Sequence, residues 1–423
     1  MTRGGLLRSP DFLRLWGAQT VSEFGTQIGQ LATPLLAIGT LHASAGALGL
    51  LGAARSAPFL VLALPAGAIL DRVRRRPVMI YADLGRFLLV GTVPVAYACG
   101  VLTMWQLCAV AALAGVLTVF FDVAYQSHLP GLVERERLTE ANSRVTASRS
   151  LAEVAGPGAA GVLVGAIGAA ATVTVDSASF LLSGLLCRTI RRPEPEPAPG
   201  ARDRSLRRDI GEGLGFVIRH PILSRVGVCA GVTNLASSMV TVLIPLYMVR
   251  SLGRGPSTVG LVLAVGGAGL VAGSLGAGPA VRRFGYGRTI VVSAVTSGIG
   301  LALLPLASGR AALPLLVGGQ LLFGLSVPLF NIAQVSLRQS VTPHRLLGRM
   351  NASMRFLVWS TISLGSLLAG GLGEAAGARA ALAVAGVIGA LSWTTLLGSP
   401  VPSLRELPAV SAQVPDKRPD PTP

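Results

Sequence analysis

Residues 67–76 read Gly67-Ala68-Ile69-Leu70-Asp71-Arg72-Val73-Arg74-Arg75-Arg76, and they join the end of an apolar segment to a cluster of arginines. The apolar segment begins near residue 46, so as a helix it is long enough to cross the hydrocarbon core of a bilayer. Arginine is costly to bury at membrane depth, so the loop that carries this cluster must lie in water. We therefore predict a membrane-spanning helix that ends at this loop.

The composition extends the same pattern to the whole chain. Of its 423 residues, 51% are hydrophobic and 13% are charged, whereas soluble proteins average about 25% charged residues. The 53 glycines and a mean hydropathy of +0.63 are typical of a multispanning membrane protein, in which small residues let helices pack closely. The sequence contains no Walker loop, HExxH, GxSxG or Cys/His cluster, so we expect no enzyme active site, metal site or cofactor.

Twelve apolar segments alternate with polar stretches along the chain. They lie at approximately 14–41, 46–70, 78–99, 103–125, 146–166, 169–188, 222–249, 257–281, 289–308, 312–335, 352–374 and 378–398. Each is long enough for a spanning helix. The sequence therefore predicts an all-α membrane protein with twelve transmembrane helices in a lipid bilayer, and the even number places both termini on one side.

The positions of the arginines indicate which side that is. The net charge is +17, and the arginines gather in alternate loops, whereas the opposite loops hold only Arg250, Arg254, Arg310 and Arg379. Cytoplasmic loops carry the excess of positive charge, so the arginine-rich loops and both termini are predicted to be cytoplasmic. In a soluble chain this charge would suggest nucleic acid as a partner. Here it follows topology, and we expect no nucleic-acid partner.

The chain divides into two halves. Residues 191–215 are rich in Pro and in charges of both signs, so we predict a cytoplasmic linker between six-helix bundles at 1–190 and 216–399. Residues 400–423 are Pro-rich and are predicted to form a disordered cytoplasmic tail. A shift of 209 residues aligns Asp122 with Asn331, Leu138 with Leu347, Asn142 with Asn351 and Gly161 with Gly370. Such a parallel repeat predicts a substrate cavity between the halves and alternating access.

Three stretches resemble the major facilitator superfamily. Residues 67–76 resemble its helix 2/3 motif, G-x-L-a-D-r-x-G-r-k, with Arg74 where the family usually has Gly. Residues 121–130, together with Leu138–Ser143 and Val175–Phe180, are similar to the branch that contains macrolide-efflux proteins and enterobactin exporters. The stretch Gly156-Pro157-Gly158-Ala159-Ala160-Gly161 resembles the antiporter motif that ends G-P-x-x-G-G, with Ala160 at the penultimate glycine.

This resemblance implies a function and two sets of residues. It implies a bacterial cytoplasmic-membrane transporter that exports a small hydrophobic or amphipathic drug or secondary metabolite against a proton gradient, and we expect a monomer. Asp71 can accept hydrogen bonds in one conformational state and release them in the other. The expected gating residues are Gly67, Asp71, Arg72, Arg75, Arg76, Asp122, Gly156 and Pro157. The expected substrate-binding residues, on helices one, four, seven and ten, are Gln27, Gln30, Asn234, Met239, Gln320 and Asn331.

Several charged residues fall inside the predicted spans, where an ionisable side chain must be paired, hydrated or functional. Glu23 and Asp176 are the expected proton-coupling residues, although Glu23 is equally interpretable as the buried partner of an arginine such as Arg55. Arg149 and Glu153 are four residues apart on one helix, so they are expected to neutralise each other.

Other charged residues have less certain roles in the sequence alone. Asp122 and the pair Asp83 and Arg86 are interpreted as gating or interdomain contacts, and Arg355 as an anion-attracting or cross-helix group. Two further functions compatible with the same fold stay open. One is uptake of a nutrient or metabolite, and the other is a membrane sensor or scaffold that transports nothing.

Overall fold

The computed structural model describes residues 6, 9–70, 73–134, 137–192, 194, 206–343 and 346–407. The regular structure in these ranges is entirely helical. The long helices are α1 (Pro10–Thr40), α2 (Ala45–Leu70), α3 (Arg75–Ala98), α4 (Met104–Leu132), α5 (Leu138–Ile167), α6 (Ala169–Thr189), α7 (Leu206–Arg219), α8 (Pro221–Leu246), α9 (Pro256–Phe284), α10 (Tyr286–Leu303), α11 (Ala312–Val341), α12 (Leu347–Ala376) and α13 (Ala378–Leu391).

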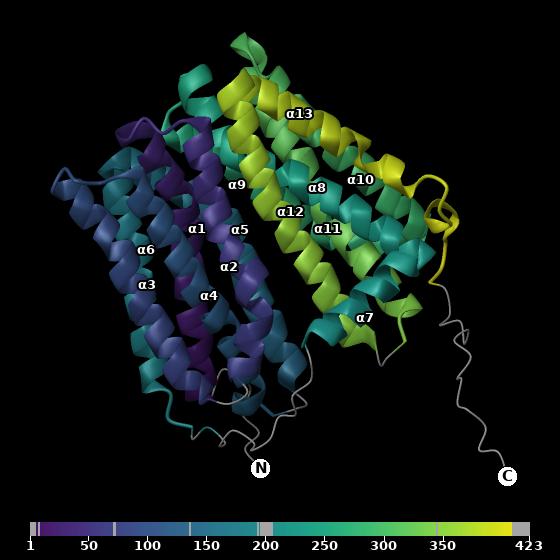
Figure 1. The fold of residues 1–423 in the computed structure, drawn as a ribbon, viewed down its shortest axis with the longest axis horizontal. Coiled ribbons are helices and arrows are strands. Elements are labelled where there is room, and N and C mark those ends of the chain that lie inside the picture. Colours follow the sequence, from purple (N-terminus) through teal and green to yellow (C-terminus); the bar gives the residue numbers. More distant parts are fainter. Residues whose placement is uncertain are drawn as a thin grey trace.

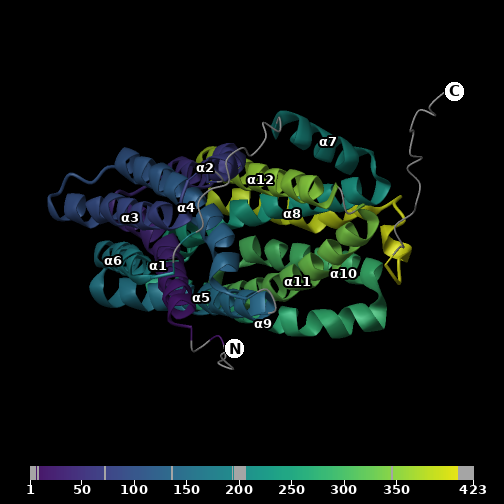
Figure 2. The same ribbon diagram turned by 90° about the horizontal axis from the view of Figure 1, so that it is seen from below.

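These helices form two bundles, with α1–α6 in one and α8–α13 in the other (Figure 1). The bundles contact each other mainly through two helix pairs, α2 with α12 and α5 with α9. The two bundles meet at the end opposite to the N-terminus and diverge toward the end where α7 lies, and a view from that end shows the two helix groups side by side (Figure 2). The helix bounds therefore place the arginine-rich loops at the divergent end.

The internal repeat is confirmed by the helix bounds. α5 and α12 both have 30 residues, and Leu347 follows Leu138 by 209 residues. Both helices end at a glycine with a φ of 84°, Gly168 and Gly377, after which the next helix begins at once. A side chain at this φ would be strained, so glycine is what permits the abrupt reversal in each half.

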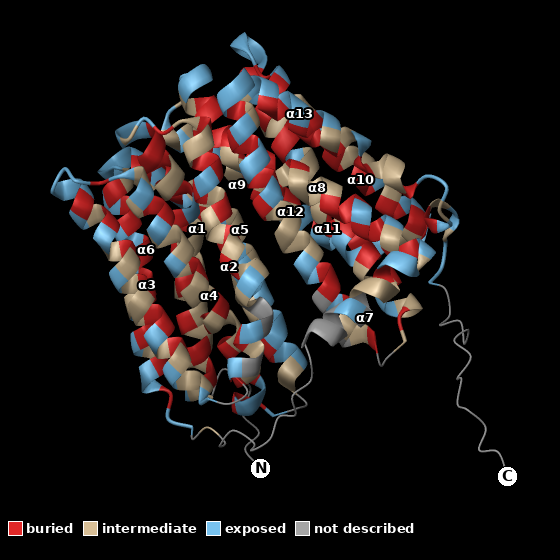
Figure 3. Ribbon diagram, viewed as in Figure 1, coloured by how far each residue is buried: buried red, intermediate tan, exposed pale blue. Residues whose placement is uncertain are grey.

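Eleven of the described helices are long and apolar enough to cross a membrane, and they correspond to the second to twelfth predicted segments. The 31-residue α1 is not among them because it carries Glu23 and three glutamines along its length. Large apolar side chains such as Leu275 and Tyr81 are 76% and 72% exposed, and exposed residues, blue in Figure 3, occur along the helices of both bundles. Such exposed apolar surface is expected where lipid covers a protein.

Small residues bring the two bundles into backbone contact. A Cβ added to Gly49 of α2 would lie 2.6 Å from the Cα of Gly370 on α12. A Cβ added to Gly161 of α5 would lie 2.8 Å from the Cα of Gly260 on α9. Gly161 and Gly370 are equivalent in the repeat, so the two contacts, which we call the α2/α12 seam and the α5/α9 seam, are related by its symmetry.

The structure adds detail to two predicted segments. Ten residues of the predicted linker at 191–215 belong to the helix α7, which begins at Leu206. The predicted tail is ordered at its start, because Val401 is fully buried and the Gly287 N–H donates a 2.8 Å hydrogen bond to the carbonyl of Leu404. The stretch 400–405 thus packs on the start of α10, and residues 408–423 lie outside the described part of the chain.

The α2/α12 seam predicts that Gly370→Leu separates the bundles at their contacting end. An added Cβ would already stand 3.0 Å from the Gly49 Cα, so the isobutyl group has no space. Spin labels at Val101 and Ala380, one in each bundle, should move apart in double electron–electron resonance measurements made in a Cys99→Ser background. Gly371→Leu is the matched control because a Cβ there meets nothing within 4 Å. Equal distances in both variants would contradict the seam.

Candidate functional site

A charged cluster joins α1 to α5 in the middle of the amino-terminal bundle. Glu23 Oε1 accepts a 3.3 Å hydrogen bond from Gln27 Nε2 and lies 3.9 Å from Arg149 Nε on α5. Arg149 Nε also donates to Glu153 Oε1 at 3.2 Å. The predicted Arg149–Glu153 pair is confirmed, and Glu23 is its third member. The Glu23 side chain is 16% exposed and that of Arg149 is 64% exposed, so the cluster remains open to solvent on one side.

Gly156 has no side chain and therefore lets α1 and α5 approach each other closely at this point. A Cβ on Gly156 would overlap the side chain of Gln27, one turn from Glu23. The next residue, Pro157, presents its carbonyl to the other bundle, where a Cβ on Gly260 would lie 2.5 Å from the Pro157 oxygen. The helix-five motif therefore contacts α1 through one residue and α9 through the next.

Asp176 is buried behind α1. Its carboxylate lies against Gly25 and Gly29, where an added Cβ on Gly29 would collide with it. Asp176 Oδ1 has no hydrogen-bond partner within the described residues. Arg55 on α2 interacts electrostatically with both Asp176 and Glu23, so this arginine is shared by the two predicted proton-coupling carboxylates.

The pair Asp83 and Arg86 on α3 lies inside the amino-terminal bundle, so its interpretation as an interdomain contact is wrong. The two side chains are hydrogen-bonded to each other and almost fully buried. The Arg86 guanidinium also lies 4.5 Å from the ring centre of Phe121 on α4 and 4.3 Å from that of Phe180 on α6. These cation–π contacts and the adjacent carboxylate compensate for the desolvation of the arginine.

Asp122 on α4 belongs to a wider electrostatic group. It interacts with Arg86, Arg149 and Glu23 of its own bundle, and with Arg355 on α12 of the other bundle. Arg355 is exposed. Arg355 has the weakest electrostatic influence on Asp122 of the groups named here, so the gating role of Asp122 stays a prediction.

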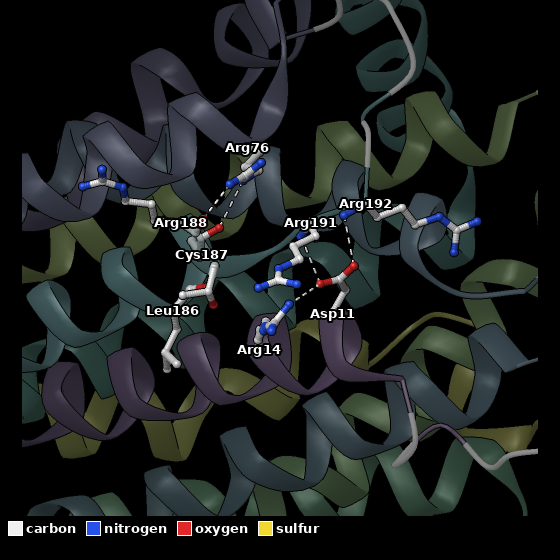
Figure 4. Close-up of polar contacts among 9 residues, drawn as sticks. Asp11, Arg14, Arg76, Leu186, Cys187, Arg188, Arg191 and Arg192 are labelled. Atoms are coloured by element: carbon white, nitrogen blue, oxygen red, sulfur yellow. Dashed lines mark hydrogen bonds and ion pairs between the residues drawn. The ribbon is translucent and has the colours of Figure 1, made fainter.

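The predicted gating arginines Arg75 and Arg76 contact groups of their own bundle. Arg76 donates from Nε to the carbonyl of Cys187 at 3.2 Å and from Nη2 to that of Arg188 at 2.6 Å, both at the end of α6 (Figure 4). Arg75 Nη1 donates to the carbonyl of Ser127 at 3.3 Å. A cation is favourable at the carboxyl end of a helix because of the helix dipole and the free carbonyls. Asp71 and Arg72 lie outside the described residues.

Two carboxylates attach the beginning of the linker to this surface. Glu194 accepts the backbone N–H groups of Arg75 and Arg76 at 2.7 and 3.1 Å, which caps the amino-terminal end of α3. Asp11 accepts those of Arg191 and Arg192 at 3.0 Å each (Figure 4). The sequence contains no signal for these pairings, because they depend on how the linker crosses the bundle.

The six predicted substrate-binding residues divide into three groups. Gln30 and Asn331 are exposed, whereas Met239 is fully buried in the core and Gln320 is 8% exposed. The remaining two amides are engaged locally, Gln27 with Glu23 and Asn234 with the Ala230 carbonyl at 2.8 Å. In this conformation Met239 and Gln320 therefore contribute to packing. Gly67, a predicted gating residue, has open space where a Cβ would stand.

A shallow, open depression of about 550 Å³ lies along the first half of α5 and was not predicted from the sequence. It is lined by Thr139, Asn142, Ser143, Thr146 and Ala147. The polar members stand at positions i, i+3, i+4 and i+7, which form one face of a helix. This spacing is the signal by which the sequence could have revealed the depression, at the end where the bundles diverge.

Comparison with known proteins gives one family. Residues 5–420 match the family model described as a transmembrane secretion effector. The multidrug efflux pump Tap of Mycolicibacterium fortuitum is 31% identical over 423 residues, which cover 96% of this chain and 98% of the relative. Tap of Mycobacterium tuberculosis is 29% identical and covers 95% of both chains, and the enterobactin exporter EntS of Salmonella typhi is 27% identical over 67% of both.

Solved structures agree on the fold. The nucleoside transporter NupG superposes with a TM-score of 0.74 at 12% identity, over 92% of this chain and 99% of its own. A bacterial homologue of the iron transporter ferroportin superposes with a TM-score of 0.71 at 17% identity, over 92% of this chain and 100% of its own. The two-bundle arrangement, the internal repeat and the full-length family match all agree. The chain therefore belongs to the major facilitator superfamily of membrane transporters, in its transmembrane secretion effector family.

Proposed function

We propose that this transporter exports a hydrophobic or amphipathic drug or secondary metabolite across the bacterial cytoplasmic membrane in exchange for protons. The relatives named as efflux pumps favour export over nutrient uptake and over a sensor or scaffold without transport activity. The observation that carries the proton coupling is the position of Glu23. It is a partly exposed carboxylate paired with an arginine on α5, the helix that forms one of the two seams between the bundles.

A protonation cycle at Glu23 follows from electrostatics. An ionised carboxylate at this depth needs Arg149 to offset its desolvation. A proton on Glu23 removes that requirement and leaves Arg149 with Glu153 on the same helix. The attraction between α1 and α5 is then weaker, and α5 is free to change its contact with α9. Proton binding on Glu23 thereby favours one arrangement of the bundles over the other.

Asp176 is the proposed second proton carrier. Four carboxylates in the amino-terminal bundle (Glu23, Asp122, Glu153 and Asp176) accompany the arginines Arg55 and Arg149, since Arg86 is already paired with Asp83. This excess of acids in an apolar bundle favours protonation of at least one of them. Asp176 is the most buried of the four and has an unpartnered oxygen, so it would hold a proton at the least cost.

In the proposed topology α1 also crosses the membrane, which brings the number of spans to twelve, and both termini lie in the cytoplasm. The arginine-rich loops lie at the divergent end, so by the positive-inside rule that end faces the cytoplasm. The conformation is then open to the inside, with the seams closing the outer end. Bundles at 1–190 and 216–399 would rock as a monomer, and the exposed Gln30 and Asn331 are the proposed substrate contacts in opposite halves.

We predict that Glu23→Gln abolishes coupled transport, because glutamine keeps the hydrogen bond to Gln27 but cannot exchange a proton. In proteoliposomes with a pH dye inside, an ethidium gradient should move protons through the parent protein and at least tenfold more slowly through the variant. Glu140→Gln is the matched control, since Glu140 forms an exposed ion pair with Arg144 at 2.8 Å and both residues lie on α5. Proton movement at the parental rate in Glu23→Gln would exclude Glu23 as the coupling site.

For Asp176→Asn we expect a lower ratio of protons moved per ethidium molecule. We expect little loss of folding stability, because Asp176 Oδ1 has no hydrogen-bond partner within the described residues that the substitution could remove. Asp83→Asn should behave oppositely. It removes the carboxylate that pairs with the buried Arg86, which costs on the order of 3 kcal/mol of folding stability. Thermal unfolding by tryptophan fluorescence measures stability, and paired dye and ethidium traces measure the ratio. An unchanged ratio in a folded Asp176→Asn protein would refute the second carrier.

A further inference from the structure

Glu374 is the only acidic residue between positions 221 and 399, a stretch that contains α8–α13. It lies near the carboxyl end of α12, and its side chain is exposed. Its Oε2 atom accepts a 3.1 Å hydrogen bond from the backbone N–H of Gly46, which belongs to α2 in the opposite bundle. The one carboxylate in this stretch is thus used to contact the other bundle.

The contact completes the cap of α2. The first N–H groups of a helix have no partner within the helix, and a carboxylate is a favourable acceptor because of the helix dipole. Ser44 satisfies one of them, since its Oγ accepts from the Ala47 N–H at 3.3 Å. Glu374 satisfies that of Gly46. The first turn of α2 is therefore capped partly by its own hydroxyl and partly by the other bundle.

The equivalent position of the α5/α9 seam has no carboxylate. The 209-residue repeat aligns Glu374 with Gly165 of α5, and a Cβ on Gly165 would lie 2.7 Å from Ser257 Oγ on α9. Ser257 Oγ donates to the Gly161 carbonyl at 3.3 Å. A hydroxyl is therefore sufficient to pack a seam at this level. The charged side chain of Glu374 is therefore not needed for close packing of the two helices.

We propose that Glu374 is an outer latch, a positioning residue that holds the end opposite the linker closed by capping α2 from the other bundle. This inference rests on the alternating access of the proposed function. The Gly49–Gly370 contact lies one helical turn deeper in the same seam, so separation of the bundles here must break the Glu374–Gly46 hydrogen bond. The latch therefore exists in the outside-closed state alone and sets how often the outer end opens.

The test measures the opening equilibrium without substrate. Spin labels at Val101 and Ala380 in the Cys99→Ser background report the separation of the outer ends in lipid nanodiscs. Removal of a helix cap shifts an equilibrium by about fivefold. We expect Glu374→Ala to raise the ratio of open to closed distances by about that factor and Glu374→Gln, which keeps an acceptor oxygen, to raise it less. Glu140→Ala, which removes an exposed acid elsewhere, should leave the ratio unchanged.

The outcomes separate the latch from the proposed function. A shift in Glu374→Ala supports the latch even when the parent moves no ethidium, in which case the proposed substrate class is wrong. An unchanged ratio in both Glu374 variants overturns the latch, even when the parent exchanges ethidium for protons. Thermal unfolding checks that both variants are folded, and Glu374→Gln preserves the side-chain volume if the alanine variant proves unstable.

Discussion

The cost of an ionised side chain at membrane depth governs the arrangement of this transporter. Each charge inside a bundle needs a partner, a hydrogen bond or a proton. Asp83 and Arg86 meet this requirement by pairing with each other among aromatic rings. Glu23 meets it through Arg149, on a different helix, so its state of protonation affects how two helices attract each other. In the proposed cycle, the same physical cost thus yields a structural pair in one place and a proton-responsive pair in another.

The acidic residues are concentrated in one half of the molecule. The stretch 221–399 contains one acidic residue, whereas α1–α6 contain Glu23, Asp83, Asp122, Glu153 and Asp176 at interior positions. The repeat shows how this difference arises, since Asp122 aligns with Asn331. Two halves built from corresponding helices therefore differ in chemistry, and proton-dependent changes are expected to originate in the amino-terminal bundle.

Much of the fold was predictable because hydropathy and the 209-residue repeat are properties of the sequence alone. The ends of the helices were less predictable than the rest of the fold. α5 begins at Leu138 and not near residue 146, and α4 continues to Leu132, because polar turns extend helices beyond the apolar core that hydropathy detects. The Arg149–Glu153 pair follows from a four-residue spacing. The Glu23–Arg149 and Glu374–Gly46 contacts depend on the rotation and meeting of distant helices, for which a single sequence carries no local pattern.

The two seams differ in the contacts that must break when they open. The α5/α9 seam consists of small residues, with Gly161 on Gly260 and one hydroxyl hydrogen bond from Ser257. The α2/α12 seam adds a 2.7 Å hydrogen bond between Ser56 and Ser363 and a stack of Phe59 on Trp359 with ring centres 4.2 Å apart.

Van der Waals contacts between small residues change gradually as helices shift, whereas a hydrogen bond or an aromatic stack is lost within a short displacement. α5 also carries Arg149, the partner of Glu23. In the proposed cycle, the α5/α9 seam is therefore the one that yields to a change in protonation, and the α2/α12 seam sets the barrier that the change must overcome.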